Sequence, residues 1–410
     1  MTTPIAAVAK ALLVFFTLVS VPGVRAEEIA PGTDWCAKAR ALPPGAELVL
    51  RPGDYEGLCS LNRGGTPEAP LVIRGQDPAR PPRIVYHGVA DNVINIRAGH
   101  ITLRGLHFGP TARNIDAVKV IAGDGVTIED CRFEAVGGIA IAANGTSVQD
   151  LTVRGNEITD SRATAMYFGC HDGGHCALAG LLVERNFIHG VDVPDPEIGY
   201  GIQVKLNSTG TIRDNVITDT KGPGIMVYGA HDVTRSTVVE GNFVAGSRTS
   251  SALVVGGGPA LVRNNIGVSS AEAGIALEDY GHRGLLREIV VVHNTVFANR
   301  KAGISAPPDR RVEARIINNA VHARTGTPAL PPARPGLLLA GNANCAALAC
   351  FRDAEHNDFS LLLPGIGIFY EAPWMPTHDY FGRLRAAPPT PGAIEGLQEP
   401  IALRLKAAPP

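Results

Sequence analysis

The sequence has 410 residues, of which 45% are hydrophobic, and its 37 basic and 39 acidic side chains give a formal charge of −2 at pH 7. A nearly balanced charge without a basic stripe excludes a general polyanion trap and argues against a nucleic acid partner. A local cationic groove for an acidic sugar chain stays compatible with this composition.

Residues 1–26 have the features of a signal peptide. Lys10 precedes the apolar run ALLVFFTLVSVPGV, and VRA closes the segment with small residues suited to a signal peptidase. Pro22 and Gly23 break the run too early for a membrane span. We therefore expect an exported protein, periplasmic or secreted, whose mature chain begins at Glu27 and has no membrane span.

Seven cysteines in such a compartment predict disulfide bonds. The connectivity stays open on sequence grounds, but three bridges suit the spacing. These are Cys36 with Cys59, Cys170 with Cys176, and Cys345 with Cys350. Cys131, in IEDCRF, is left over, and we expect it to be a buried free thiol.

A short pattern recurs along the chain, as in VTIEDCRF, LTVRGNEI, LLVERNFI and GTIRDNVI. Each copy has alternating apolar residues, a polar corner that is usually asparagine, and a second apolar pair. The corners lie 23 to 30 residues apart. They are Cys131, Asn156, Asn186, Asn215, Asn242, Asn265, Asn294 and Asn319, with Gln76 and Leu106 as less regular earlier members. Asparagines at equivalent corners can hydrogen-bond along a stack.

Between successive corners lies a second strand signal, often opened by glycine, as in GIAIAA, GIQVKL and GIMVYG. Strands this short cannot bury both faces alone, and the intervals have no helical period. Stacking coil on coil adds each strand to a parallel sheet and buries the aliphatic side chains in one continuous core. The sequence therefore predicts an all-β fold, a single-stranded parallel β-helix of about ten coils within residues 27–340.

Both ends of such a solenoid need covers, because each end exposes a sheet edge and a section of core. TDWCAKARAL predicts a short N-terminal capping helix with Thr33 or Asp34 as its N-cap. The apolar stripe of this helix consists of Trp35, Ala39 and Leu42. Residues 341–410 lose the repeat and are rich in proline, and we expect this irregular C-terminal tail to pack along the β-helix. Its aromatic residues include Phe369, Tyr370, Trp374 and Phe381.

This is the pattern of a right-handed parallel β-helix, and the chain resembles the pectate-lyase-like superfamily of exported carbohydrate-active proteins over roughly residues 44–340. ELVLRPGDYEG looks like the entry coil of such proteins. DYFGRLRAAPPTPGAIEG is similar to the pattern that often closes them. The resemblance implies the fold and the broad class of carbohydrate-active protein.

The strand within GYGIQVKLNS predicts two faces with different chemistry. Its inner face consists of Ile202, Val204 and Leu206. Its outer face carries Gln203 and Lys205. Tyr228 takes the equivalent outward position in the next coil, ~4.8 Å from Lys205, and Tyr167 is the neighbour of Gln203 in the preceding coil. The coils before this region offer mostly alanine and glycine on the same face.

Two loops add ionisable groups beside this strand. The loop CHDGGHC leaves the preceding coil at the same end and, if it is closed by a disulfide, holds His171, Asp172 and His175 near Lys205. The segment YGAHDVTR follows Tyr228 and supplies His231, Asp232 and Arg235.

A groove lined by this strand and these two loops would suit β-elimination of an acidic polysaccharide. The site must neutralise a uronate carboxylate, remove the C5 proton and protonate the departing glycosidic oxygen. A lysine whose pKa is lowered by burial or nearby cations can be the base, and a tyrosine one coil away can supply the proton. The expected catalytic residues are Lys205, Tyr228 and His171. The expected substrate-binding residues are Tyr167, Asp172, His175, Gln203, His231 and Arg235.

The segment IQVKLNSTGTIRDNVITDTKGPGIMVYG is similar in layout to the catalytic segment of the chondroitinase B and alginate lyase family. The resemblance implies that Lys205 is the base and that Tyr228 stands where that family has an arginine. It also implies a calcium ion, for which Asp195 and Glu197 are the nearby candidates, displaced from the family spacing. We expect no other cofactor.

Three alternatives stay open. A glycoside hydrolase needs paired carboxylates, and the candidates are Asp172, Asp232, Glu278 and Asp279. A uronan C5-epimerase shares the early lyase steps, although the alginate epimerase signature DPHD does not occur. A non-catalytic glycan-binding or surface β-helix is the alternative of another class. We expect a monomer whose partner is an acidic polysaccharide, and the sequence leaves the identity of that polymer open.

Overall fold

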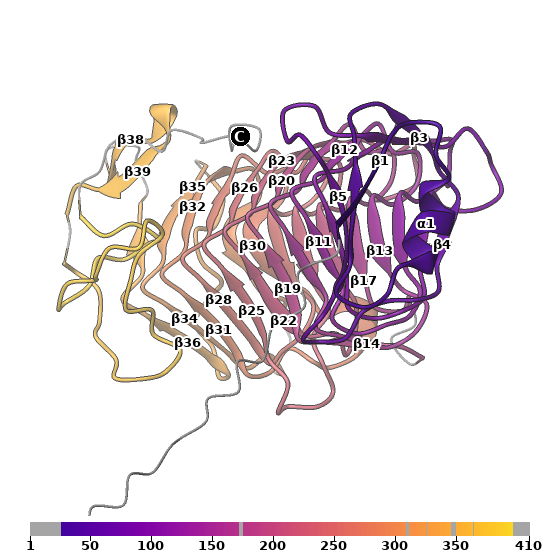
Figure 1. Cartoon of the computed structure of the whole chain (residues 1–410). Coiled ribbons are helices and arrows are strands. Elements are labelled where there is room, and N and C mark those ends of the chain that lie inside the picture. Colours follow the sequence, from indigo (N-terminus) through magenta and orange to yellow (C-terminus); the bar gives the residue numbers. More distant parts are fainter. Residues whose placement is uncertain are drawn as a thin grey trace, which may run out of the picture.

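The protein is a long solenoid of short strands. The structure, a computed structural model, describes residues 26–171, 175–308, 311–324, 326–345, 350–363 and 365–396. Each strand of the solenoid pairs in parallel with the equivalent strand of the next turn, so that three long sheets run along the axis (Figure 1). The predicted signal peptide, apart from Ala26, lies outside the described residues.

The largest sheet has 13 strands within the described residues. In spatial order it contains β1 (Ala26–Ile29), β2 (Glu47–Leu50), β5 (Leu71–Gly75), β8 (Ile101–Arg104), β11 (Thr127–Glu129), β15 (Thr152–Arg154), β19 (Leu181–Glu184), β22 (Gly210–Arg213), β25 (Thr237–Glu240), β28 (Ala260–Arg263), β31 (Ile289–Val292), β34 (Ala314–Ile317) and β36 (Leu337–Ala340). We call it the 13-strand sheet.

The second sheet has 12 strands in the described part of the chain. It contains β3 (Asp54–Glu56), β6 (Arg83–Val85), β9 (His107–Phe108), β12 (Arg132–Glu134), β16 (Glu157–Thr159), β20 (Phe187–Val191), β23 (Val216–Thr220), β26 (Phe243–Ala245), β29 (Ile266–Val268), β32 (Thr295–Asn299), β35 (Ala320–Ala323) and β37 (Ala343–Asn344).

The third sheet, called the 10-strand sheet for its described strands, carries the strand GIQVKL. It contains β4 (Cys59–Leu61), β7 (Ile94–Ile96), β10 (Val118–Val120), β13 (Ile141–Ala143), β17 (Met166–Phe168), β21 (Ile202–Val204), β24 (Ile225–Val227), β27 (Leu253–Val255), β30 (Ala273–Leu277) and β33 (Ala302–Ser305). Two short pairs complete the described strands. They are β14 (Val148–Gln149) with β18 (Leu178–Ala179), and β38 (Phe351–Asp353) with β39 (Asp358–Leu361).

The parallel β-helix prediction is confirmed, but about ten coils was too few, because the 13-strand sheet implies about thirteen turns. The corner residues used for the prediction mark the ten turns from β5 to β34. The turns of β1 and β2 precede the first corner, and the turn of β36 follows the last one. These end turns depart from the spacing or corner chemistry of the repeat and were therefore missed.

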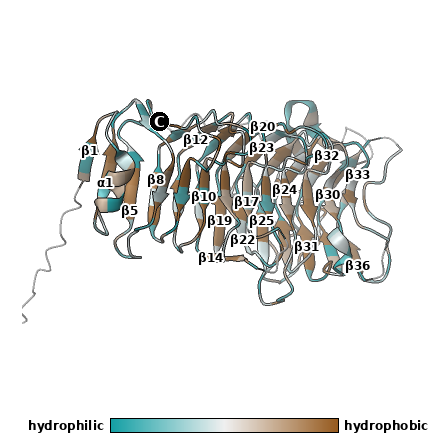
Figure 2. Ribbon diagram, turned by 90° about the vertical axis from the view of Figure 1, so that its right-hand side faces the viewer, coloured by the Kyte–Doolittle hydropathy of each residue, from teal (hydrophilic) through white to brown (hydrophobic). Residues whose placement is uncertain are grey.

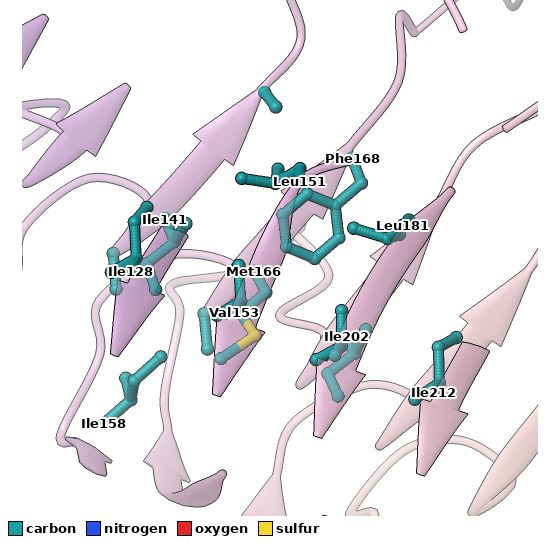
Figure 3. Packing of buried hydrophobic residues seen from close by; sticks show 14 of the residues in the cluster. Ile128, Ile141, Leu151, Val153, Ile158, Met166, Phe168, Leu181, Ile202 and Ile212 are labelled. Atoms are coloured by element: carbon teal, nitrogen blue, oxygen red, sulfur yellow. The ribbon is translucent and has the colours of Figure 1, made fainter. Parts of the chain in front are cut away.

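Side chains from all three sheets meet in one core inside the solenoid. Hydrophobic residues are concentrated in the strands of the solenoid, as Figure 2 shows. Met166 and Phe168 of β17 and Ile202 of β21 pack among aliphatic side chains of neighbouring turns, as Figure 3 shows. All three are fully buried, and truncating the largest of them, Phe168, to alanine would cost about 3–5 kcal/mol of stability.

The predicted asparagine corners form a continuous ladder. Asn186 Oδ1, for example, accepts hydrogen bonds from the backbone N and the Nδ2 of Asn156, each at 3.0 Å. The ladder begins where Cys131 N donates to Asn156 Oδ1 and ends at Asn342, one turn beyond the last predicted corner. Cys131 is a buried free thiol as expected, and burial raises its pKa to about 12.

Helix α1 (Trp35–Ala41) covers the N-terminal end (Figure 1). Asp34 is its N-cap, since the carboxylate accepts a hydrogen bond from Ala37 N at 2.9 Å. The predicted bridge between Cys36 and Cys59 ties this helix to β4, and the other two predicted bridges, Cys170 with Cys176 and Cys345 with Cys350, also form.

The tail beyond β37 contains the short helix η3 (Ala354–His356) and long irregular segments. Tyr370 and Trp374 pack on an apolar strip of the 13-strand sheet that includes Val292 and Ile317. By contrast, the side chain of Phe369 is 65% exposed. In the described residues no helix has the length and apolar character needed to span a membrane.

Candidate active site

Lys205 follows β21 directly and lies on the outer side of the 10-strand sheet. The predicted alternation holds within β21, because Ile202 and Val204 enter the core whereas Gln203 aligns with Tyr167 and Met226 on the outer face. Lys205 N donates to Phe168 O at 2.8 Å, which fixes the backbone against the preceding turn.

Leu206 does not continue the inner face, so that part of the prediction was wrong. Its side chain belongs to an outer apolar cluster with Met226 and Tyr228. The alternation ends because β21 ends at Val204 and the chain then turns. In this turn Ser208 N donates to Lys205 O at 3.0 Å, and Asn207 takes a left-handed conformation with φ of 64°.

A glycine in the preceding turn makes room for the lysine. Gly169 has φ of 93°, in the region that favours glycine. A Cβ at this position would lie 3.0 Å from Lys205 Cβ and 2.3 Å from Ser208 Oγ. The aliphatic part of the Lys205 side chain therefore packs directly against the backbone of residue 169.

The amine of Lys205 is surrounded by tyrosine rings. Its Nζ lies 4.2 Å from the ring centroid of Tyr228 and 5.4 Å from that of Tyr167. Tyr280 packs edge-on against Tyr228, with 4.8 Å between ring centroids. The aromatic faces offset part of the cost of burying this cation, whose side chain is only 3% exposed. We call this arrangement the tyrosine pit.

The hydroxyl groups of the pit are linked. Gln203 Nε2 donates to the hydroxyl oxygen of Tyr228 at 3.0 Å. The phenol groups of Tyr228 and Tyr200 interact, and each contributes to the pKa of the other. Burial raises the pKa of both phenols, and of Tyr228 far above its usual range. Both tyrosines are therefore neutral proton carriers at physiological pH.

Arg283 brings a second cation to the pit. Its guanidinium carbon lies 5.3 Å from the ring centroid of Tyr280 and 5.9 Å from that of Tyr228. Burial, and secondly the charge of Arg283, lower the pKa of Lys205 to about 8. Within the described residues, neither Lys205 nor Arg283 forms an ion pair with a carboxylate. The pit therefore holds two cations that the described chain does not neutralise.

The predicted loop residues lie around the pit without joining it. His171 and His175 are exposed in the loop closed by the Cys170–Cys176 bridge, and Asp172 lies outside the described residues. His231 Nδ1 lies 3.0 Å from Asn207 Oδ1, just beyond the lysine. Among the described residues, neither His171 nor His231 hydrogen-bonds to the amine of Lys205.

The carboxylates considered for a hydrolase are engaged locally. Asp232 Oδ1 accepts hydrogen bonds from Thr234, and Asp232 lies 4.0 Å from the Nε of Arg235. Asp279 Oδ1 accepts a hydrogen bond from Gly284 N at 2.9 Å. Both carboxylates thus stabilise turns of loops, and Glu278 is exposed at the start of the connection between β30 and β31.

The residues considered for calcium do not fit the ion. Asp195 Oδ1 lies 2.6 Å from Lys221 Nζ, and Glu197 Oε1 lies 3.2 Å from Arg113 Nη2. Calcium needs six to eight oxygen ligands, several of them carboxylates, whereas each of these carboxylates already faces a cation. In the described ranges no group of three or more His, Cys, Asp or Glu residues is placed to hold a metal ion.

Sequence reasoning missed Tyr200, Tyr280 and Arg283. The last two come from the connection between β30 and β31, which includes the short helix η1 (Tyr280–His282) and spans residues 278–288. The equivalent connection of the preceding turn spans only residues 256–259. An insertion that carries an aromatic residue and an arginine, LEDYGHRGLLRE, was the available signal.

Other outward positions also differ from the prediction that earlier coils carry mostly alanine and glycine. Asn95 of β7 and Lys119 of β10 take the positions equivalent to Gln203. Lys119 Nζ lies 3.4 Å from Asp116 Oδ2, so this lysine has a counter-charge that Lys205 lacks in the described part of the protein.

Comparison with known proteins agrees with this architecture. Residues 94–327 match the model of the family described as the right-handed β-helix region. Among solved structures, the PL6 family polysaccharide lyase Pedsa3628 from Pseudopedobacter saltans aligns over 92% of this chain and 97% of its own, with 12% identity and a TM-score of 0.55. The GH136 lacto-N-biosidase from Eubacterium ramulus aligns over 78% of this chain and 68% of its own, with 12% identity and a TM-score of 0.56.

At such identities these likenesses concern the fold alone, and the two neighbours differ in the reactions that their names give them. A search of curated proteins finds no significant relative. The function must therefore be argued from the site.

Proposed function

The chain belongs to the right-handed β-helix family, and we propose that it is an exported polysaccharide lyase that cleaves a uronate-containing polymer by β-elimination. The observation that carries this proposal is Lys205, an amine in the tyrosine pit whose pKa is lowered to about 8. An ordinary lysine is almost fully protonated at neutral pH, whereas an amine with this pKa is free base in a useful fraction of molecules.

The proposed reaction needs one base and one acid. The Nζ lone pair of Lys205 takes the C5 proton of a uronate, the C4–C5 double bond forms, and the bond from C4 to the glycosidic oxygen breaks. That oxygen takes a proton from the tyrosine pair. Tyr200 is the more exposed of the two, and the neighbouring hydroxyl of Tyr228 can replace its proton.

The other predicted residues have supporting roles in this proposal. Tyr167 offers a ring on which a sugar can stack, and Gln203 orients Tyr228. His171, His175 and His231 lie on exposed loops at the rim, where they can contact a bound chain. Three disulfide bonds suit an exported protein.

The low exposure of Lys205 sets a condition on this proposal. An amine in a side chain that is 3% exposed reaches a sugar only if the loop with Tyr280 moves or the flexible stem of Lys205 swings outward. Tyr280 itself is 44% exposed and lies at the rim. Movement of such loops on binding is common in enzymes that exclude water from the reaction.

The test is a panel of acidic polysaccharides (alginate, pectin, glycosaminoglycans and bacterial exopolysaccharides) read by the ultraviolet absorbance of the new double bond. We expect Lys205→Ala to lower the rate on the active polymer at least about 1,000-fold while circular dichroism stays unchanged. Lys38→Ala is the matched control, because Lys38 is exposed on α1 at the N-terminal end of the solenoid and pairs with Glu27.

Each other result identifies an alternative. Reducing ends without the new absorbance would indicate a glycoside hydrolase. Inversion at C5 without chain cleavage would indicate an epimerase. Binding of a polymer with no change in it would indicate a glycan-binding protein. Full activity of Lys205→Ala would refute the proposed base.

A further inference from the structure

The tyrosine pit carries an excess of positive charge. Lys205 and Arg283 both contact the ring of Tyr228, at 4.2 Å and 5.9 Å from its centroid. Arg283 Nη1 donates to Tyr280 O at 3.4 Å, and no carboxylate in the described ranges pairs with either cation. Two like charges at a partly dry site repel each other, and an anion bound between them removes that cost.

The acidic residues of the same loop do not supply that anion. The carboxylate of Asp279 accepts a hydrogen bond from Gly284 N within the turn. The charge of Glu278 acts on Tyr200, but among the described residues Glu278 forms no ion pair with Lys205 or Arg283. The positive charge of the pit is therefore available to an anionic ligand, because the carboxylates of this loop do not pair with it.

We infer that Arg283 binds the carboxylate of the uronate at which the chain is cleaved and neutralises it without a metal ion. This inference rests on the proposed lyase function. A guanidinium can bind a carboxylate through two parallel hydrogen bonds, and it stabilises the negative charge that the carboxylate gains when Lys205 removes the C5 proton. The electron pair then forms the double bond and leaves with the glycosidic oxygen, so the step needs no other reactant.

Other cations near the pit are less suited to this role. Arg235 already faces Asp232 at 4.0 Å on an exposed loop. Lys221 pairs with Asp195 at 2.6 Å, and Arg113 pairs with Glu197 at 3.2 Å, so both cations and both calcium candidates are occupied. Arg283 is the arginine that touches the same tyrosine as the base.

The experiment compares the susceptible polymer as free acid and as methyl ester, with wild-type protein, Arg283→Gln and Arg283→Lys. The ester carries no charge for Arg283 to neutralise. We expect Arg283→Gln to lower kcat/KM about 100-fold on the free acid but less than about threefold on the ester. Arg283→Lys should recover part of the loss on the free acid, and a chelator should leave the wild-type rates unchanged. Arg300→Gln, at an exposed arginine, is the control for the loss of one charge.

Equal losses for Arg283→Gln on the two substrates would overturn the inference while leaving the lyase proposal intact. So would loss of wild-type activity in chelator that calcium restores. If wild-type protein forms no unsaturated product from any polymer of the panel, the lyase proposal fails and the inference with it. Lys205→Ala separates the two claims, because it should abolish the reaction on both the acid and the ester.

Discussion

The outer faces of the 13-strand sheet and the 10-strand sheet treat charge in opposite ways. On the 13-strand sheet, cations and carboxylates alternate from turn to turn between β8 and β28. Glu184 on β19 accepts hydrogen bonds from Arg213 Nη2 at 2.6 Å and from Arg185 Nη2 at 2.7 Å, and Glu129 on β11 lies between Arg104 and Arg154. In the tyrosine pit of the 10-strand sheet, two cations face aromatic rings instead.

The difference separates a structural surface from a functional one. Burial alone would raise the pKa of Glu184, but the hydrogen bonds from Arg213 and Arg185 outweigh it and hold the pKa below its usual range. At Lys205 burial and a like charge act in the same direction and lower the pKa to about 8. Charges that are paired within the chain stabilise the fold, whereas the unpaired cations of the pit are available to bind an anionic ligand.

After removal of Lys205 itself, we expect the largest loss of activity from Tyr228→Phe, a change within the unbalanced pit. Loss of the hydroxyl removes the proton relay to Tyr200, and we expect kcat to fall about 100-fold. The lost hydrogen bond from Gln203 should cost only about 1 kcal/mol of stability.

Tyr55→Phe is the matched control for that variant, because the Tyr55 hydroxyl is also hydrogen-bonded, to Ile29 O and Arg51 O near the N-terminal cap. It should lose similar stability and no activity. Equal activity of the Tyr228 and Tyr55 variants would show that the relay is not used.

The second expectation concerns pH. The base must lose its proton, so kcat/KM should rise about tenfold per pH unit below about 8 and level off above it. Arg283→Gln removes the like charge that lowers the pKa of Lys205, and the midpoint of the profile should therefore move to higher pH. A midpoint that stays in place or moves to lower pH would contradict the claim that the charge of Arg283 lowers the pKa of Lys205.

The third expectation concerns stability. The pKa of Lys205 falls from 10.5 to about 8 on folding, so the unfolded chain binds more protons between these values and stability increases with pH across this window. At pH 7 the buried charge is a cost. We expect Lys205→Met to raise the free energy of unfolding at pH 7 by roughly 1–3 kcal/mol while it abolishes activity. Chemical denaturation at pH 7 measures this free energy of unfolding. A variant less stable than the wild type would contradict the claim that the buried charge of Lys205 destabilises the fold.

The smallest effect is expected on the balanced surface. Glu184→Gln leaves two arginines without their shared carboxylate, and since both are about half exposed, the loss should be about 1 kcal/mol. Its elimination rate should equal that of the wild type. A large fall in activity would mean that the 13-strand sheet takes part in the reaction after all.

Much of the fold followed from local chemistry. The asparagine corners identified the turns because each side-chain amide bonds to the same corner of the next turn, as Asn156 does with Asn186. The alternation of β21 then placed Gln203 outward and predicted Tyr228 beside Lys205. Repeats that stack directly make such neighbours predictable from sequence alone.

The remainder of the site depended on loops, which have no repeat to fix them. Arg283 reaches the ring of Tyr228 from a connection that follows β30, two turns beyond β24. Leu206 left the inner face because the strand ended one residue before Lys205. The calcium candidates Asp195 and Glu197 were judged by distance in sequence, whereas their side chains pair with Lys221 and Arg113 from other turns.

A crystal structure of the Lys205→Ala variant with an oligosaccharide of the susceptible polymer tests the account most directly. We expect one uronate above the tyrosine pit, with its carboxylate hydrogen-bonded to Arg283 and its C5 hydrogen directed at the space left by the missing amine. A sugar chain bound elsewhere on the solenoid, or a carboxylate held by a metal ion away from Arg283, would contradict it.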